Sequence, residues 1–311
     1  MTNSQDQAPR PIVAVIPGRL AASVSSEAVL AMQRQDWWRT AQEVASDWQA
    51  VSPYADFWEF GAPAVGYGRA HELAGLLASG GEQLALALAA LAETELWRAF
   101  REANPVDDSE QGKGRGAAYE MGHRAMAELA SYYLLGIGHG LANITARAMA
   151  LDSTLHPDLL DALGTWCPPG SDDPKDWLSL NRDTARALRR VARRSERPAL
   201  ELLVESITAL LTDDDWQELN RRRGAHYHRR RPQSGGVAGV PLASPWVESG
   251  MSMSLNAFGR EYTDGDGLAH DTSGLARRVL ARLAVTMKTL QERVMATWQD
   301  VHDRAANSQA P

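Results

Sequence analysis

One short segment of the sequence concentrates residue types that act on phosphates. From Asn220 to Ser234 it holds six arginines, two histidines and a tyrosine. A histidine transfers protons near neutral pH, and a guanidinium binds a phosphate through parallel hydrogen bonds. Together they equip a site where the 2′-hydroxyl of RNA attacks the adjacent phosphate without a metal. The alternatives are phosphate binding without turnover and a solvated basic loop that neutralises the acidic run Asp213 to Asp215.

An arginine followed by four to six residues and a histidine, at the end of a helix in an all-α domain, resembles the HEPN (higher eukaryote and prokaryote nucleotide-binding) superfamily. Three pairs fit this spacing, and they are Arg221 with His226, Arg223 with His228, and Arg222 with His228. We favour Arg223 with His228, because Gly224 allows the backbone to turn between them. The same glycine is expected to end the preceding helix.

The resemblance implies a metal-independent endoribonuclease in a toxin or phage-defence role, acting as a homodimer, with an antitoxin or other protein as a possible partner. By this resemblance His228 transfers the proton and Arg223 holds the phosphate, with His226 and Arg222 as alternates. The expected substrate contacts are Arg229, Arg231 and Tyr227. No metal and no cofactor is expected. The alternative function is a non-catalytic helical module that binds a nucleotide or a protein.

A second set of polar residues lies on the expected central helix. His139, Asn143 and Arg147 recur every four residues, so they follow one side of that helix. Gly136, Gly138 and Gly140 nearby allow another backbone or a ligand to approach closely. We interpret the polar line either as a hydrogen-bonded network between helices or as a wall of the same site that binds substrate.

Two weaker patterns complete the candidates. The spacing of Glu120 and His123 is typical of di-iron bundles, but no second copy occurs, so no di-iron centre is expected. The stretch Asn181 to Arg194 predicts a helix with one basic ridge, formed by Arg182, Arg186, Arg189 and Arg193. That ridge either guides a nucleic-acid backbone or is an ordinary solvated face.

The periodicity of apolar residues predicts an all-α bundle of about eight helices. Helices are expected over Ser26 to Trp48, Gly68 to Leu77, Glu82 to Arg101, Ala117 to Leu151, Asn181 to Arg194, Pro198 to Leu211, a short helix from Asp213, and Ser273 to Arg304. Ser79-Gly80-Gly81 predicts the turn of a helical hairpin. Residues 1–25 and 307–311 are interpreted as tails around one domain at 26–306, with a possible subdivision at the Gly-rich loop 104–116. A further long loop is expected from Pro232 to Asp271.

Composition limits the class of protein. The net charge of −7 excludes a generally basic nucleic-acid coat. Of the 32 basic residues only three are lysines, so the positive charge is carried almost entirely by arginines. Cys167 is the only cysteine, so an internal disulfide and a cysteine zinc site are excluded. The longest apolar run, Leu84 to Ala92, is too short to cross a membrane. We therefore expect a cytoplasmic protein with no membrane partner and with RNA or a nucleotide as its ligand.

Overall fold

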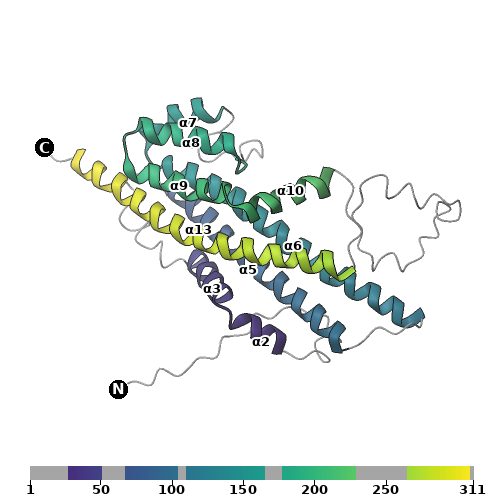
Figure 1. Ribbon diagram of the computed structural model, residues 1–311. Coiled ribbons are helices and arrows are strands. Elements are labelled where there is room, and N and C mark those ends of the chain that lie inside the picture. The colour runs from purple at the N-terminus through teal and green to yellow at the C-terminus, as the bar shows by residue number, and fades with distance from the viewer. Residues whose placement is uncertain (1–26, 51–66, 104–109, 165–176, 229–264, 309–311) are drawn as a thin grey trace, which may run out of the picture.

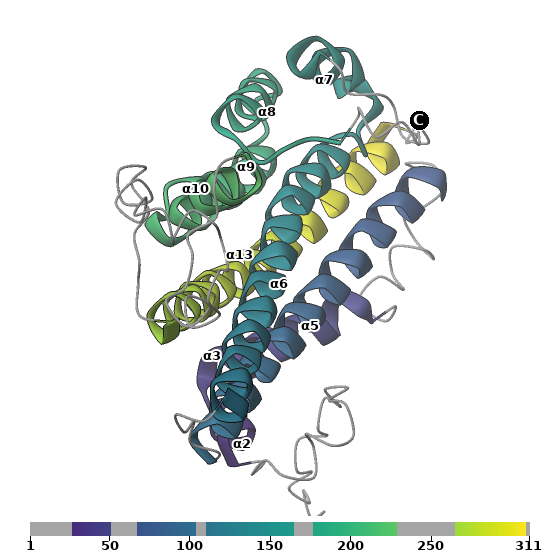
Figure 2. The same ribbon diagram turned by 90° about the vertical axis from the view of Figure 1, so that its right-hand side faces the viewer.

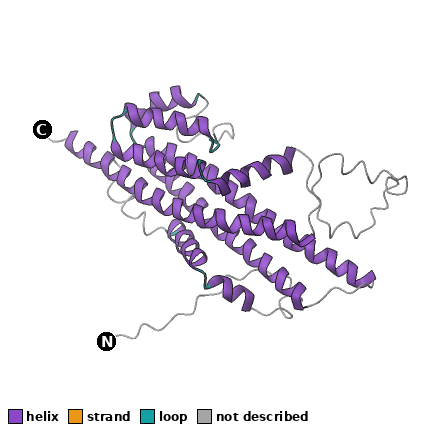
Figure 3. Ribbon diagram, viewed as in Figure 1, coloured by secondary structure: helices purple, strands orange, loops and turns teal. Residues whose placement is uncertain are grey.

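The computed structural model describes residues 27–50, 67–103, 110–164, 177–228 and 265–308, and within them the chain is all-α. Figure 3 shows helices joined by loops, and the described residues contain no strand. The α-helices are α2 (Glu27–Gln33), α3 (Asp36–Gln49), α5 (Tyr67–Ala103), α6 (Glu110–Met149), α7 (His156–Leu163), α8 (Arg182–Arg194), α9 (Pro198–Leu211), α10 (Asp214–His228) and α13 (Gly265–Ser308). A 3₁₀ turn, Ser153–Leu155, precedes α7. The expected tail at 1–25 lies outside the described residues. The expected tail at 307–311 begins too early, because α13 continues to Ser308, and 309–311 lie outside the described residues.

Three long helices form the frame of the molecule. Helix α5 packs along α6, and α13 packs across α6 and α9 (Figure 1 and Figure 2). Helices α5 and α6 are antiparallel, since Trp97 contacts Gly122 while Gln83 contacts Gly136. The core between the long helices is rich in leucine and alanine, and it includes Leu84, Leu88, Leu134, Leu141, Leu283 and Leu290.

The predicted helical hairpin at Ser79-Gly80-Gly81 is wrong, because α5 continues through it. Its two glycines instead let α3 approach α5. A Cβ at Gly81 would lie 2.8 Å from the carbonyl oxygen of Ala45, and one at Gly80 would lie 2.9 Å from the indole of Trp48. A glycine in a helix costs only about 1 kcal/mol relative to alanine. Burying the large indole of Trp48 offsets that cost.

The single helix predicted from Ser26 to Trp48 is divided in two. Helix α2 ends at Gln33, and Gln35 has the extended conformation typical of a residue before a new helix. Asp36 then places a carboxylate in the first turn of α3, where the helix dipole favours it. The break changes which apolar residues are buried, so Trp38 is in the core while Leu30 is 42% exposed.

Helices α6, α8, α9, α10 and α13 agree with the predicted positions and differ at their ends, whereas α7 was not among the predicted helices. The predictions for α8 and α9 are confirmed to within one residue. Helix α6 begins at Glu110, so the last part of the predicted loop 104–116 is helical. Helix α13 begins at Gly265, so the end of the predicted loop Pro232 to Asp271 is also helical. The rest of that loop lies outside the described residues.

Helices α7, α8 and α9 form a second layer above the frame (Figure 1). An ion pair between Asp152 and Arg197 links the chain before α7 to the N-cap of α9. Burial by itself raises the pKa of Asp152, but hydrogen bonds from Thr154 and Arg197 outweigh it and the pKa is lowered. This carboxylate is therefore ionised at neutral pH, where it fixes the start of the second layer.

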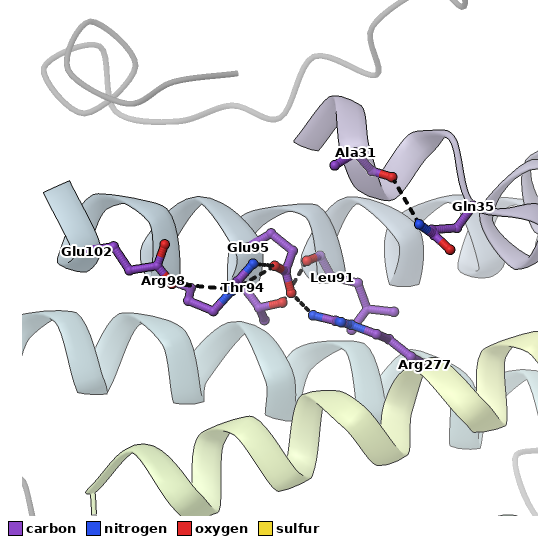
Figure 4. A network of polar contacts seen from close by, with 8 residues as sticks. All are labelled: Ala31, Gln35, Leu91, Thr94, Glu95, Arg98, Glu102 and Arg277. Atoms are coloured by element: carbon purple, nitrogen blue, oxygen red, sulfur yellow. Dashed lines mark hydrogen bonds and ion pairs between the residues drawn. The ribbon is translucent and has the colours of Figure 1, made fainter. Parts of the chain in front are cut away.

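A buried carboxylate connects α5 to α13 (Figure 4). The side chain of Glu95 is only 5% exposed, and it forms ion pairs with Arg98 of the same helix and with Arg277 of α13. Arg98 also reaches the exposed Glu102 one turn further along. Burial lowers the pKa of Arg277. The pairing with Glu95 offsets part of the cost of removing both charges from water.

Helix α5 is the one described helix that is long and apolar enough to cross a membrane, as judged by length and composition. The apolar runs of the sequence predict no such segment, because the longest of them, Leu84 to Ala92, is too short. In this fold, leucines of α5 pack into the core, among them Leu73, Leu77, Leu84, Leu88 and Leu91. Core helices have the same length and composition, so this feature by itself does not assign a membrane location.

Candidate functional site

The Arg/His segment is carried by α10, whose N-terminus is bound to α13. Asp213 accepts a hydrogen bond from the backbone N–H of Trp216 and so caps the helix. Both oxygens of Asp215 accept from Nε of Arg278, at 3.0 and 3.1 Å, and Asp213 lies 3.4 Å from Arg282. Two residues of the acidic run, Asp213 and Asp215, thus pair with arginines of α13.

One residue of α10 inserts into the core. The side chain of Trp216 is 1% exposed and lies against Gly138 of α6. A Cβ at Gly138 would lie 1.9 Å from Cη2 of this indole, so only glycine fits. The close approach expected at the α6 glycines is thus made by a tryptophan. It holds the first turn of α10 at a defined point on α6.

Glu218 is the centre of the charged cluster on α10. Its two carboxylate oxygens accept from Nε and Nη2 of Arg221, each at 2.7 Å, and one of them also accepts from Nε of Arg222 at 2.7 Å. The hydrogen bonds from Arg221, and then those from Arg222, lower the pKa of Glu218 to about 2 despite the opposing effect of burial. Glu218 is therefore ionised at any physiological pH and orients both guanidiniums.

The expectation that Gly224 ends the helix is wrong, because α10 continues to His228. Gly224 is tolerated inside a helix because its neighbours Arg222, Arg223 and Ala225 form helix readily. The continuation changes the geometry of the candidate pairs. Positions 223 and 228 are five residues apart, which is a rotation of about 140° around the helix. Positions 222 and 226 differ by about 40°, so they follow one another on one face.

Several candidate residues lie where no side chain is described. The backbone of Arg223, His226, Tyr227 and His228 belongs to α10, but their side chains are outside the described part of the structure. Arg229 and Arg231 lie outside the described residues entirely. The described side chains of this segment are those of Arg221, which is exposed, and Arg222, which is 22% exposed. The site is therefore built from Glu218, Arg221, Arg222 and the helical positions that follow them.

The polar line on α6 holds the chain that leads into α8. Asn143 donates from Nδ2 to the carbonyl oxygen of Leu178 at 2.8 Å and accepts from the N–H of Leu178 at 3.0 Å. The N–H of Leu180 donates to Nδ1 of His139 at 3.0 Å, so this nitrogen carries no proton. These bonds satisfy buried backbone groups, which supports the interpretation of the line as a network between helices.

Arg147, the last residue of the polar line, makes a different contact. Nε of Arg147 donates to Glu72 of α5 at 2.6 Å, and the guanidinium is almost buried. The ion pair therefore links α5 and α6 rather than facing a ligand. His139 and Asn143 thus bind the same stretch of chain, 178–180, whereas Arg147 binds α5.

Sequence reasoning missed three residues that position these elements, namely Glu218, Trp216 and Glu72. The spacing of Glu218 to Arg221 and Arg222, three and four residues, is the signal that would have found this cluster. No local signal identifies Trp216 as the partner of Gly138, or Glu72 as the partner of Arg147. These contacts join residues that are distant in the sequence.

The described residues contain no group of three or more His, Cys, Asp or Glu side chains that could hold a metal ion. No protein-family model, no curated protein and no solved structure matches this chain.

Proposed function

We propose that this protein is a metal-independent endoribonuclease of the HEPN kind, with its active site on the C-terminal half of α10. The supporting observation is that α10 continues through the Arg/His segment. Glu218, Arg222 and His226 then recur every four residues along one side of a single helix. Arg222 is already oriented by Glu218 from the preceding turn.

In this arrangement each residue has a chemical role. Arg222 is the phosphate clamp, since a guanidinium stabilises the charge that builds on the phosphorus oxygens. His226 is the proton-transfer group for the attacking 2′-hydroxyl, a step for which an imidazole is suited near neutral pH. Glu218 touches no substrate and serves as a positioning residue for Arg222. The proposal thus replaces Arg223 and His228 with Arg222 and His226. Three residues separate this pair, one fewer than the shortest spacing of the HEPN pattern, so the pair rests on the shared helix face and not on the motif.

The test is cleavage of labelled single-stranded RNA and transfer RNA in EDTA. Wild type is compared with His226→Ala and His228→Ala, and His71→Ala, an exposed histidine of α5, is the matched control. We expect His226→Ala to lower the cleavage rate by about a hundredfold or more, because general acid–base catalysis contributes that much. We expect the other two variants to cleave like wild type.

Each alternative has its own result. Loss of cleavage in His228→Ala alone would restore the pairing of Arg223 with His228. A wild-type protein that cleaves neither RNA contradicts the proposed function. Mixing Arg222→Ala with His226→Ala tests the dimer that the resemblance implies, since partial recovery requires the two residues to act from different copies.

A non-catalytic RNA-binding module is the second candidate function. It is favoured by the exposed arginines of α8, which can hold a phosphate backbone without any chemistry. Binding of RNA by wild type without cleavage would support this candidate and contradict the first.

A further inference from the structure

The exposed side of α8 is a continuous basic face. Four arginines occupy a sector of about 60° around the helix axis and extend over about 16 Å of its length, and they are Arg182, Arg186, Arg189 and Arg193. Arg190 lies beside them on the same exposed side. The opposite side is apolar and buried against α7 and α9, through residues such as Leu188 and Val191. The helix is therefore firmly packed, and only its basic face is accessible.

Most of these arginines lack a carboxylate partner within the described residues. Arg186 pairs with Asp183 at 3.2 Å, and Arg194 reaches Asp158 at 3.7 Å. Both pairs are exposed and contribute little to stability. No ion pair with a carboxylate is formed within the described residues by Arg182, Arg189, Arg190 or Arg193. A row of like charges is costly for the fold, and a bound polyanion would remove that cost.

An aromatic side chain stands at the beginning of this face. Trp177 lies five residues before α8, and half of its surface is exposed. The backbone on either side of Leu178 is held by Asn143 and His139 of α6. Asn181 then caps α8 by accepting from the N–H groups of Asp183 and Thr184. The chain that carries Trp177 is therefore attached to both α6 and α8.

We propose that Trp177 and the basic face of α8 form a binding surface for single-stranded RNA. The arginines neutralise successive phosphates, and the indole of Trp177 stacks on an unpaired base. A duplex keeps its bases stacked on one another and offers none to an indole, so the surface favours a single strand. This inference rests on the proposed function in taking RNA as the ligand.

An anionic membrane is the competing partner for a basic helix. An interfacial helix buries an apolar face in the lipid and keeps its charges at the edge. The apolar side of α8 is already buried in the protein, and its exposed side carries arginines rather than large apolar residues. The chemistry of this face therefore fits a phosphate backbone better than a lipid surface.

The position of the surface relates it to α10. Asn143 and His139 hold the chain before α8, and the neighbouring Gly138 receives Trp216 of α10. The beginnings of α8 and α10 are thus attached to the same turns of α6. Both helices also lie on the same side of the α6 and α13 frame (Figure 1 and Figure 2). A strand bound along α8 is directed toward the helix that carries the proposed active site.

The test measures binding of a fluorescein-labelled 2′-O-methyl RNA strand to the full chain by fluorescence anisotropy. This probe lacks the free 2′-hydroxyl, so it binds without being cut by the proposed chemistry. The variants are Arg189→Gln/Arg193→Gln and Trp177→Ala. The matched controls are Arg34→Gln/Arg39→Gln, which removes the same charge from exposed sites around α3, and Trp177→Phe, which keeps an aromatic ring.

We expect the α8 double variant to bind about tenfold more weakly near 0.1 M salt, and its salt slope to fall by about 1.4 for the two lost phosphate contacts. Trp177→Ala should bind about tenfold more weakly with an unchanged salt slope. Both controls should bind within about twofold of wild type. Circular dichroism and thermal melting check that every variant is folded.

Other outcomes overturn the inference. These are equal binding by wild type and the α8 variants, preference for the duplex form of the probe, or no binding of RNA together with binding to phosphatidylglycerol vesicles. Failure of the proposed function gives a different result, since the probe would then bind through α8 while ordinary RNA stays uncut. Cleavage of RNA with α8 variants that bind like wild type would instead reject only the inference.

Discussion

Trp216 of α10 lies so close to Gly138 of α6 that a single added carbon would be 1.9 Å from its ring. This contact joins the helix of the Arg/His segment to the central helix of the frame. Because the indole is fully buried, the contact also decides how α10 is rotated about its own axis. The faces that α10 presents to solvent, including the side with Glu218 and Arg222, follow from it.

Gly138→Ala is therefore expected to destabilise the protein by about 1–3 kcal/mol, the usual cost of overpacking a core. Urea denaturation measures this loss. Gly140→Ala is the matched control, since a Cβ there meets nothing within 4 Å. In a helix the alanine is favoured over glycine, so Gly140→Ala should be neutral or stabilise by up to about 1 kcal/mol. Equal effects of both variants would contradict the packing of Trp216.

Glu218 predicts a pH dependence of stability. Its pKa in the folded protein, about 2, is below the ordinary value of 4.5, so folding favours the ionised form. The stabilisation is complete above about pH 4.5 and is lost as the pH falls toward 2. Glu218→Gln should lower the free energy of unfolding by about 0.5–1 kcal/mol at neutral pH, because solvent screens this partly exposed cluster.

The measurement for Glu218 is urea denaturation of wild type and Glu218→Gln between neutral pH and about pH 3. The difference between the two proteins should shrink as the pH falls. Glu43→Gln, at an exposed position of α3, is the control and should show no such change. A difference that stays constant with pH would mean that Glu218 is not held ionised by Arg221 and Arg222.

Asn143→Ala should loosen the chain before α8. The variant removes both hydrogen bonds to Leu178 and leaves two buried backbone groups unsatisfied, at a cost of about 1–3 kcal/mol. Native-state hydrogen exchange should show faster exchange of the Leu178 amide. The amide of Ala185 bonds to the carbonyl oxygen of Asn181 and should be little affected, which provides an internal control. Unchanged protection of Leu178 would contradict the role of Asn143.

Glu95→Gln tests the buried network of Figure 4. The variant leaves the half-buried guanidinium of Arg277 without this carboxylate, and breaking a buried ion pair costs about 3–5 kcal/mol. Glu102→Gln is the control, because Glu102 pairs with the same Arg98 but is 64% exposed. It should change the free energy of unfolding by less than about 1 kcal/mol. Similar losses in both variants would show that Arg98, rather than Arg277, is the important partner of Glu95.

Features governed by neighbouring residues were predictable from the sequence. The all-α class follows from the recurrence of apolar residues at helical spacing. The bounds of α8 and α9 were predictable because Asn181 caps the first and Pro198 begins the second, and both signals act within one turn. The predicted line of His139, Asn143 and Arg147 also depends only on the geometry of one helix.

Features governed by distant residues were decided by the tertiary structure. Gly80 and Gly81 indicate a turn when read locally, but burial of Trp48 against them makes the straight helix more stable. Gly224 indicates a helix end, and the continuation of α10 past it moves the candidate catalytic pair from Arg223 and His228 to Arg222 and His226. The sequence by itself thus determined which residues can act on phosphates. Only the structure, in which α10 continues through Gly224 to His228, determined which of them follow one face, because the rotation between two positions is fixed only when both belong to the same helix.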